Sequence, residues 1–145
     1  MIPRLVDIGG PWKVLPPGIH DATLREVEMS FATTPHRKRL FRGLRLALDA
    51  LKKSGCSTVY LDGSFVTEKP IPADYDACWD DSGVNAASLD RVLLDFTNKR
   101  RAQKKKYMGE LFPAGIRAAA GRKFIDFFQT DRHTGRKKGI IRIRL

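Results

Sequence analysis

Two short segments carry the residue types that could do chemistry in this chain. The first is Tyr60-Leu61-Asp62-Gly63-Ser64, and Asp74-Tyr75-Asp76-Ala77 follows after nine further residues. β-Branched and aromatic residues at 57–61 predict a strand that stops at the Gly-Ser turn. A second strand would place Asp74 and Asp76 on one face, because side chains alternate along a strand. Two such carboxylates repel each other unless a cation lies between them, so we expect a divalent ion, Mg²⁺ or Mn²⁺.

These residue types suit the transfer of a phosphoryl or nucleotidyl group. That chemistry needs phosphates held in line and the developing negative charge neutralised. Asp74 and Asp76 are the predicted metal ligands, Gly63 would let the backbone approach a phosphate, and Ser64 could donate its hydroxyl and N–H to phosphates. The alternative is structural: Gly63-Ser64 closes a turn, and the two aspartates are solvated on an exposed strand.

The two segments together resemble the signature of the nucleotidyltransferase superfamily that includes DNA polymerase β, in its minimal single-domain branch. That signature is an apolar residue, Gly-Ser, a spacer, and then Asp-apolar-Asp/Glu-apolar. Asp62 is the one departure, because it lies where an apolar residue is commoner. Residues 15–20, 110–114 and 138–141 also resemble segments of small bacterial nucleotidyltransferase-like proteins.

The resemblance implies a magnesium-dependent enzyme that moves a nucleoside monophosphate from a nucleoside triphosphate to an acceptor hydroxyl. It implies that Asp76 bridges two metal ions and that a third acid comes from a later strand. Glu110 is the best-placed candidate because it lies in a predicted strand, whereas Asp95 and Asp126 lie in predicted helices. Minimal members of the superfamily often work in toxin–antitoxin or phage-defence modules, so the resemblance implies that role as well.

Charge is distributed unevenly along the chain. Residues 1–96 hold 12 Lys and Arg against 13 Asp and Glu, whereas residues 97–145 hold 15 against 3. This asymmetry favours a polyanionic partner, either RNA (tRNA in particular) or an acidic protein. The residues expected to contact such a partner are Lys104, Lys105, Lys106, Arg132, Lys137 and Lys138. Two other functions stay open: a non-catalytic nucleic-acid-binding protein on the same scaffold, and a module that docks an acidic partner.

The first half of the chain predicts an arm and two helices around the first segment. An irregular arm is expected over residues 1–20, followed by a single domain over 21–145. Asp21 would cap a short helix. Thr34 and Pro35 would start a long amphipathic helix that ends before Gly55.

The residues after the two aspartates predict a further amphipathic helix. It would start at Asn85 or Ser88 and run into the basic segment 99–106. Asp95 would then lie four residues before Lys99 on the helix surface, where the two form an ion pair rather than part of a site.

The last third predicts a strand over residues 107–113, a short helix at 124–128, a turn at 133–135 and a last strand at 140–145, and no element is predicted for 114–122. This order favours an α+β fold in which helices back one face of a small mixed sheet of about four strands. It is also similar to the minimal nucleotidyltransferase core.

Composition excludes several other classes of site. Cys56 and Cys78 are too few for a disulfide framework, and three scattered histidines do not form a zinc site. No apolar run is long enough to cross a bilayer, and the first residues do not follow a signal-peptide pattern. We therefore expect a cytoplasmic protein.

Overall fold

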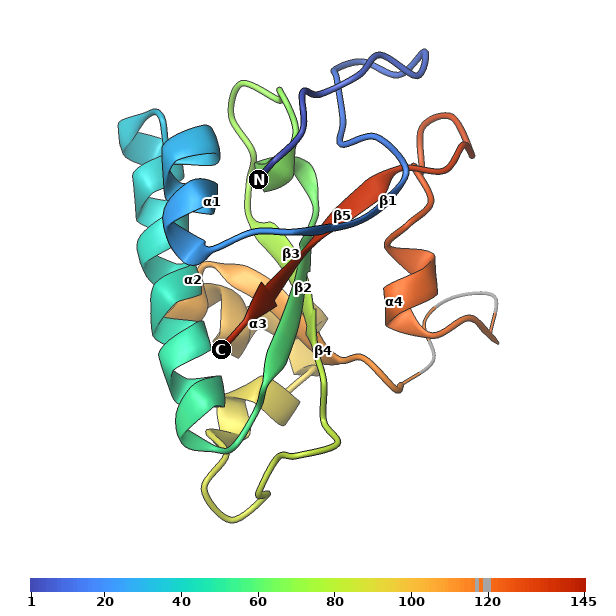
Figure 1. The fold of residues 1–145 in the computed structure, drawn as a ribbon. Helices are drawn as coiled ribbons and strands as arrows, with labels where there is room; N and C mark the ends of the chain where they lie inside the picture. Colours follow the sequence, from blue (N-terminus) through green and yellow to red (C-terminus); the bar gives the residue numbers. More distant parts are fainter. Residues whose placement is uncertain (117, 119–120) are drawn as a thin grey trace.

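A mixed five-stranded sheet forms the centre of the computed structural model, which describes residues 1–116, 118 and 121–145 (Figure 1). The strands are β1 (Gly18–Asp21), β2 (Thr58–Asp62), β3 (Tyr75–Trp79), β4 (Gly109–Pro113) and β5 (Gly139–Arg144). Their order is β1-β5-β2-β3-β4, with β5 antiparallel to β2, β2 antiparallel to β3, and the two outer pairs parallel. The predicted α+β class is confirmed, but the sheet has five strands rather than about four. Part of the linker 114–122 lies outside the described residues.

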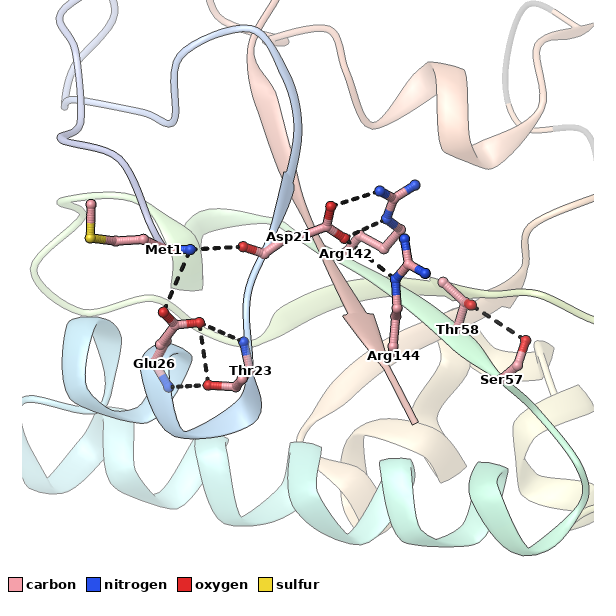
Figure 2. A network of polar contacts seen from close by, with 8 residues as sticks. All are labelled: Met1, Asp21, Thr23, Glu26, Ser57, Thr58, Arg142 and Arg144. Atoms are coloured by element: carbon pink, nitrogen blue, oxygen red, sulfur yellow. Dashed lines mark hydrogen bonds and ion pairs between the residues drawn. The ribbon is translucent and has the colours of Figure 1, made fainter.

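The additional strand comes from the segment expected to be an irregular arm. β1 pairs in parallel with β5, and Asp21 at its end accepts hydrogen bonds from Arg142 Nε and Nη2 at 2.6 and 2.7 Å (Figure 2). Asp21 is therefore not the helix cap. That role belongs to Thr23, whose hydroxyl oxygen accepts from Glu26 N while the Glu26 carboxylate accepts from Thr23 N, a reciprocal capping box.

Two helices, α1 (Leu24–Phe31) and α2 (Pro35–Lys53), pack on one face of the sheet (Figure 1). The predicted start of the long helix is confirmed, since the Thr34 hydroxyl oxygen accepts from Arg37 N and Pro35 is the first helical residue. Its apolar stripe enters the main core, which contains Leu40, Leu44, Ala47, Leu48 and Leu51.

The other face of the sheet carries a second, smaller core. Cys78, Ile140 and Phe128 are buried there, next to the short helix α4 (Phe124–Phe127). Figure 1 shows α4 on the side of the sheet opposite α1 and α2, so the expectation of helices on one face only is wrong. The short helix at this position is itself confirmed.

The amphipathic helix expected from residue 85 or 88 is absent. In its place the chain makes turns and a short 3₁₀ helix, η2 (Arg91–Leu94), before α3 (Thr97–Tyr107) begins. Asp95 lies between them, and its carboxylate accepts from Thr97 N and Oγ1 rather than from Lys99. Three consecutive residues, 98–100, have left-handed backbone angles with φ of 51°, 57° and 60°, so the regular right-handed helix starts only after them.

Candidate active site

Three carboxylates lie side by side across three neighbouring strands. Asp62 ends β2 opposite Asp76 of β3, and Asp76 lies opposite Glu110 of β4. Because side chains alternate, all three point to the α4 side of the sheet, as do Tyr60, Cys78 and Phe112 two residues away. We call Asp62, Asp76 and Glu110 the carboxylate row. Glu110 is therefore adjacent to Asp76. The sequence predicts Asp74 within the second strand, but it lies one residue before β3.

Gly63 brings the backbone against the carboxylate row. Its φ is +86°, and a Cβ at this position would lie 2.8 Å from Asp76 Oδ2 and 2.9 Å from Asp76 N. Only glycine fits both the backbone angle and the space. Ser64 then opens a 3₁₀ helix, η1 (Ser64–Val66), so the Gly-Ser turn predicted from the sequence is confirmed.

A buried arginine holds the loop that follows Ser64. Arg37 Nη1 donates to the carbonyl oxygens of Phe31 and Phe65 at 3.3 and 2.7 Å, and Nη2 donates to those of Thr67 and Lys69 at 2.9 and 2.5 Å. Arg37 is only 5% exposed, and this burial lowers the pKa of its guanidinium. This side chain therefore fixes the path of residues 65–69 against the start of α2.

Cations from two other elements pair with the ends of the row. Lys138 Nζ donates to Asp62 Oδ1 at 2.5 Å, and the two side chains are only 12% and 6% exposed. At the other end, Arg100 Nη2 and Lys104 Nζ lie 3.1 and 2.9 Å from Glu110 Oε1. Among the described residues, Asp76 in the middle of the row has no cationic side chain within ion-pair distance.

The pKa values follow from this arrangement. Burial raises the pKa of Asp76 well above its ordinary value, and the charges of Asp62, Asp74 and Glu110 raise it further. Burial also raises the pKa of Asp62, and the contact with Lys138 offsets part of this rise. The pKa of Asp74 is raised by burial and by the nearby charge of Glu110. Burial acts in the same direction on Glu110, but hydrogen bonds from Lys104 and Arg100 outweigh it and lower the Glu110 pKa.

The carboxylate row forms part of the wall of a cleft of about 700 Å³, a volume typical of sites for small molecules. Gly63, Ser64 and Asp74 also line it. The remaining polar lining includes Thr67, Lys69, Arg100, Arg122, Thr130, Asp131, Arg132, His133 and Lys138. The aromatic lining is Trp12, Phe112, Phe124, Phe127 and Phe128. The cleft thus combines carboxylates, cations and flat apolar rings, and it contains every catalytic and nucleotide-binding residue predicted from the sequence.

The oxygen donors of the row have the chemistry that Mg²⁺ or Mn²⁺ prefers, and Asp76, which is partly buried and has no cationic partner among the described residues, is the group that a cation would stabilise. Within residues 1–116, 118 and 121–145, no three His, Cys, Asp or Glu side chains converge on one point as they stand. Lys138 holds Asp62 at one end of the row, and both Arg100 and Lys104 hold Glu110 at the other. A cation at Asp76 would therefore compete with these lysine and arginine contacts.

The two other candidates for a third acid lie outside this arrangement. Asp95 is engaged by Thr97, and Asp126 is exposed on α4. Neither is among the residues that line the cleft.

The basic residues predicted to contact a polyanion fall into two groups. Lys105, Arg132 and Lys137 are exposed, with no ion pair to another described residue. Lys104 pairs with Glu110, Lys106 pairs with Asp90, and Lys138 is largely buried against Asp62. Lys138 therefore belongs to the cleft, whose lining also includes the exposed Arg132.

Sequence reasoning missed two kinds of cleft residue. Asp62 stands in the sequence only as a departure from the family signature, although its place opposite Asp76 follows from a strand that ends at the Gly-Ser turn. Trp12 and Lys69 gave no signal, because the cation–π contact between them, at 5.0 Å, depends on a long-range fold of the first residues onto the loop after η1.

The chain matches a family of unknown function (DUF6932) over residues 11–144, and it belongs to that family. Comparison with the curated proteins and with the solved structures gave no match. The matched range contains the whole carboxylate row. In the described part of the chain, no helix has the length and apolar character to cross a membrane.

Proposed function

We propose that this member of the DUF6932 family is a divalent-metal-dependent nucleotidyltransferase on a nucleotidyltransferase-like scaffold. The observation that carries the proposal is the carboxylate row beside Gly63-Ser64, at the wall of a cleft that also holds cations and aromatic rings. Asp74 and Asp76 are partly buried in the wall of the cleft rather than fully exposed, which favours a site over two solvated aspartates. The likeness to the polymerase β superfamily in these residues supports the same reaction.

Each predicted residue has a role that fits its place. Asp74 and Asp76 would hold Mg²⁺ or Mn²⁺, and a bound ion would neutralise charge that develops on the phosphates. Gly63 and Ser64 would hold the phosphates through backbone N–H groups and the serine hydroxyl. Glu110, whose pKa is lowered, is ionised at neutral pH and could accept the proton of the acceptor hydroxyl.

The acceptor is proposed to be RNA, tRNA in particular, or an acidic partner protein. The basic last third of the chain supports both, and a role in a toxin–antitoxin or phage-defence module would be consistent with either. The cytoplasm, where triphosphates and RNA are abundant, is the compartment that such a reaction requires.

Label transfer tests the reaction. The protein is incubated with labelled nucleoside triphosphates, Mg²⁺ and total RNA, beside an Asp74→Asn/Asp76→Asn variant. An Asp80→Asn/Asp81→Asn variant removes two charges at the other end of β3, away from the cleft lining, and serves as the matched control. Transfer by the wild type and the control but not by the first variant supports the proposal. Equal transfer by all three would rule out catalysis by these aspartates.

A non-catalytic polyanion-binding protein is the second candidate. Exposed Lys105, Arg132 and Lys137, free of ion pairs to described residues, favour it. RNA binding without any label transfer under these conditions would support this candidate over the first.

A further inference from the structure

The contact between Asp62 and Lys138 joins two parts of the cleft that are far apart in the sequence. Asp62 ends β2 and belongs to the carboxylate row, whereas Lys138 directly precedes β5. Their side chains meet at 2.5 Å and are both largely buried. A buried ion pair of this kind is costly to break unless each partner finds a replacement for the other.

The backbone around Lys138 is fixed, so that only its side chain could change partners. Lys138 N donates to Gln129 O at 3.0 Å, Lys137 forms a β-bridge with Thr130, and Gly139 N donates to Leu15 O at 2.9 Å. The four-carbon stem of lysine can reorient its ammonium group without moving these atoms.

The position of Lys138 puts its ammonium group near the expected phosphates. Asp62 immediately precedes Gly63-Ser64, and Lys138 lines the same cleft as both. Three other cations of the cleft contact other side chains: Arg100 binds Glu110, Lys69 lies over the Trp12 ring at 5.0 Å, and Arg122 lies over the Phe127 ring at 5.6 Å. Arg132 also lines the cleft but is exposed and makes no ion pair with the carboxylate row. Lys138 is thus the cation that links the Gly-Ser end of the carboxylate row to the open cleft.

We propose that Lys138 is a phosphate-binding residue which Asp62 holds until a divalent cation joins the carboxylate row. When that cation satisfies Asp62, the Lys138 ammonium group is released to a phosphate of the bound nucleotide. When a phosphate engages Lys138 first, Asp62 becomes available to the cation. Cation and nucleotide therefore bind interdependently, and this inference rests on the nucleotide-binding function proposed above.

The coupling is reciprocal, as any coupling between two binding sites must be. Loss of Lys138 should free Asp62 and strengthen cation binding in the absence of nucleotide. Loss of the Asp62 charge should free Lys138 and strengthen phosphate binding in the absence of metal. Both gains should disappear when the two residues are changed together.

Two titrations with single ligands test this. Mn²⁺ alone is titrated by paramagnetic resonance, and inorganic tripolyphosphate is titrated in the presence of EDTA by calorimetry. The variants are Lys138→Met, Asp62→Asn and their combination, with Lys53→Met as the matched control because Lys53 is exposed at the end of α2. Thermal unfolding of each variant verifies folding, and Asp62→Asn keeps the test available if Lys138→Met does not fold.

We expect Lys138→Met to raise the Mn²⁺ affinity and Asp62→Asn to raise the tripolyphosphate affinity, each by about tenfold. The double variant should lose both gains, and Lys53→Met should match the wild type. A gain in tripolyphosphate affinity that persists in the double variant would reflect general charge alone and would overturn the inference. Unchanged affinities in the single variants would overturn it as well.

The failure of the proposed function gives a different result. If wild-type Mn²⁺ binding is unaffected by Asp74→Asn/Asp76→Asn, the metal site itself is wrong and the inference falls with it. If that binding is lost in the aspartate variant but the Lys138 and Asp62 variants behave like the wild type, only the exchange of partners is wrong.

Discussion

At the scale of single residues, the contact between Gly63 and Asp76 joins backbone conformation to chemistry. A methyl group at Gly63 would meet both a strained φ of +86° and the Asp76 carboxylate at 2.8 Å. We expect Gly63→Ala to lower the free energy of unfolding by about 3 kcal/mol. Gly135→Ala is the control, because its φ of +73° carries a backbone cost of about 1–2 kcal/mol with no neighbour within 4 Å. Urea unfolding measures the free energy of unfolding of both variants. Equal losses would contradict a destabilising contact between Asp76 and the Cβ that Gly63→Ala introduces.

The partly buried Asp76 carboxyl predicts an unusual dependence of stability on pH. Its pKa is higher in the folded protein than in the unfolded chain, so its contribution to stability is fully present below the ordinary value of 3.8 and is lost as pH rises through the folded pKa. Asp76→Asn should therefore be more stable than the wild type at pH 8 without added metal. The difference should shrink as the pH falls toward 3.8.

Denaturant unfolding at several pH values measures this effect. Asp95→Asn is the control, since hydrogen bonds from Thr97 lower the pKa of Asp95 and give the opposite sign. It should not gain stability at pH 8. An Asp76→Asn variant less stable than the wild type at that pH would contradict a raised pKa of Asp76 in the folded protein.

At the scale of elements, Arg37 ties the start of α2 to the loop after Gly63-Ser64. Arg37→Met keeps much of the side-chain volume but leaves four carbonyl oxygens without their donor. We expect a loss of about 3 kcal/mol in the free energy of unfolding. Arg39→Met, on the exposed face of the same helix, should change it by no more than about 0.5 kcal/mol. Similar losses in both variants would mean that Arg37 acts through general charge.

A glycine inside α2 sets the position of the helix relative to β4. A Cβ at Gly43 would lie 2.2 Å from Tyr107 O and 2.8 Å from Met108 Cβ, just before the strand that carries Glu110. Alanine in a helix is ordinarily more favourable than glycine by about 1 kcal/mol. Gly43→Ala should instead destabilise the protein by about 2 kcal/mol because the site is overpacked. Thermal unfolding that shows a gain would disprove this close packing.

The elements recovered from the sequence are those with strong local signals. The Thr34 cap with Pro35 and a long apolar stripe predicted α2, and a β-branched run before Gly63 predicted β2. The stretch from Asn85 to Phe96 carries apolar residues at helical spacing, yet it forms turns and η2, because its apolar side chains reach the core without a regular helix. Periodicity alone could not separate these outcomes.

The strand β1 could not have been found by the same means. Its four residues, Gly18–Asp21, gain their conformation from pairing with β5, more than a hundred residues later. For the candidate site, the local pattern placed Gly63, Ser64 and Asp76 together, and a strand assignment brought in Glu110. The Asp62–Lys138 contact depends on the order of strands, which no local pattern carries.

At the scale of the whole molecule, the exposed basic residues of the last third of the chain predict a salt-dependent affinity for RNA. Lys105, Arg132 and Lys137 are exposed, and changing all three to Ala should weaken binding and reduce the slope of log K against log salt. The reduction should be about 0.7 for each phosphate of a single strand that the variant no longer neutralises. The control variant changes Lys38, Arg39 and Lys53, exposed on α2, in the same way. Filter binding at several salt concentrations measures both slopes, and equal slopes in the two variants would remove the predicted residues from the interface.

The strand order also determines when the fold can be completed. β5, the last strand in the sequence, lies between β1 and β2 and pairs with both. During synthesis, β1 has no neighbour in the sheet until β5 has been made, and the edge of β2 stays open for the same time. Such long-range pairing slows folding, because a long loop must close before the strands gain their hydrogen bonds. Lys138 arrives with β5, so Asp62 acquires its cation only at this final step.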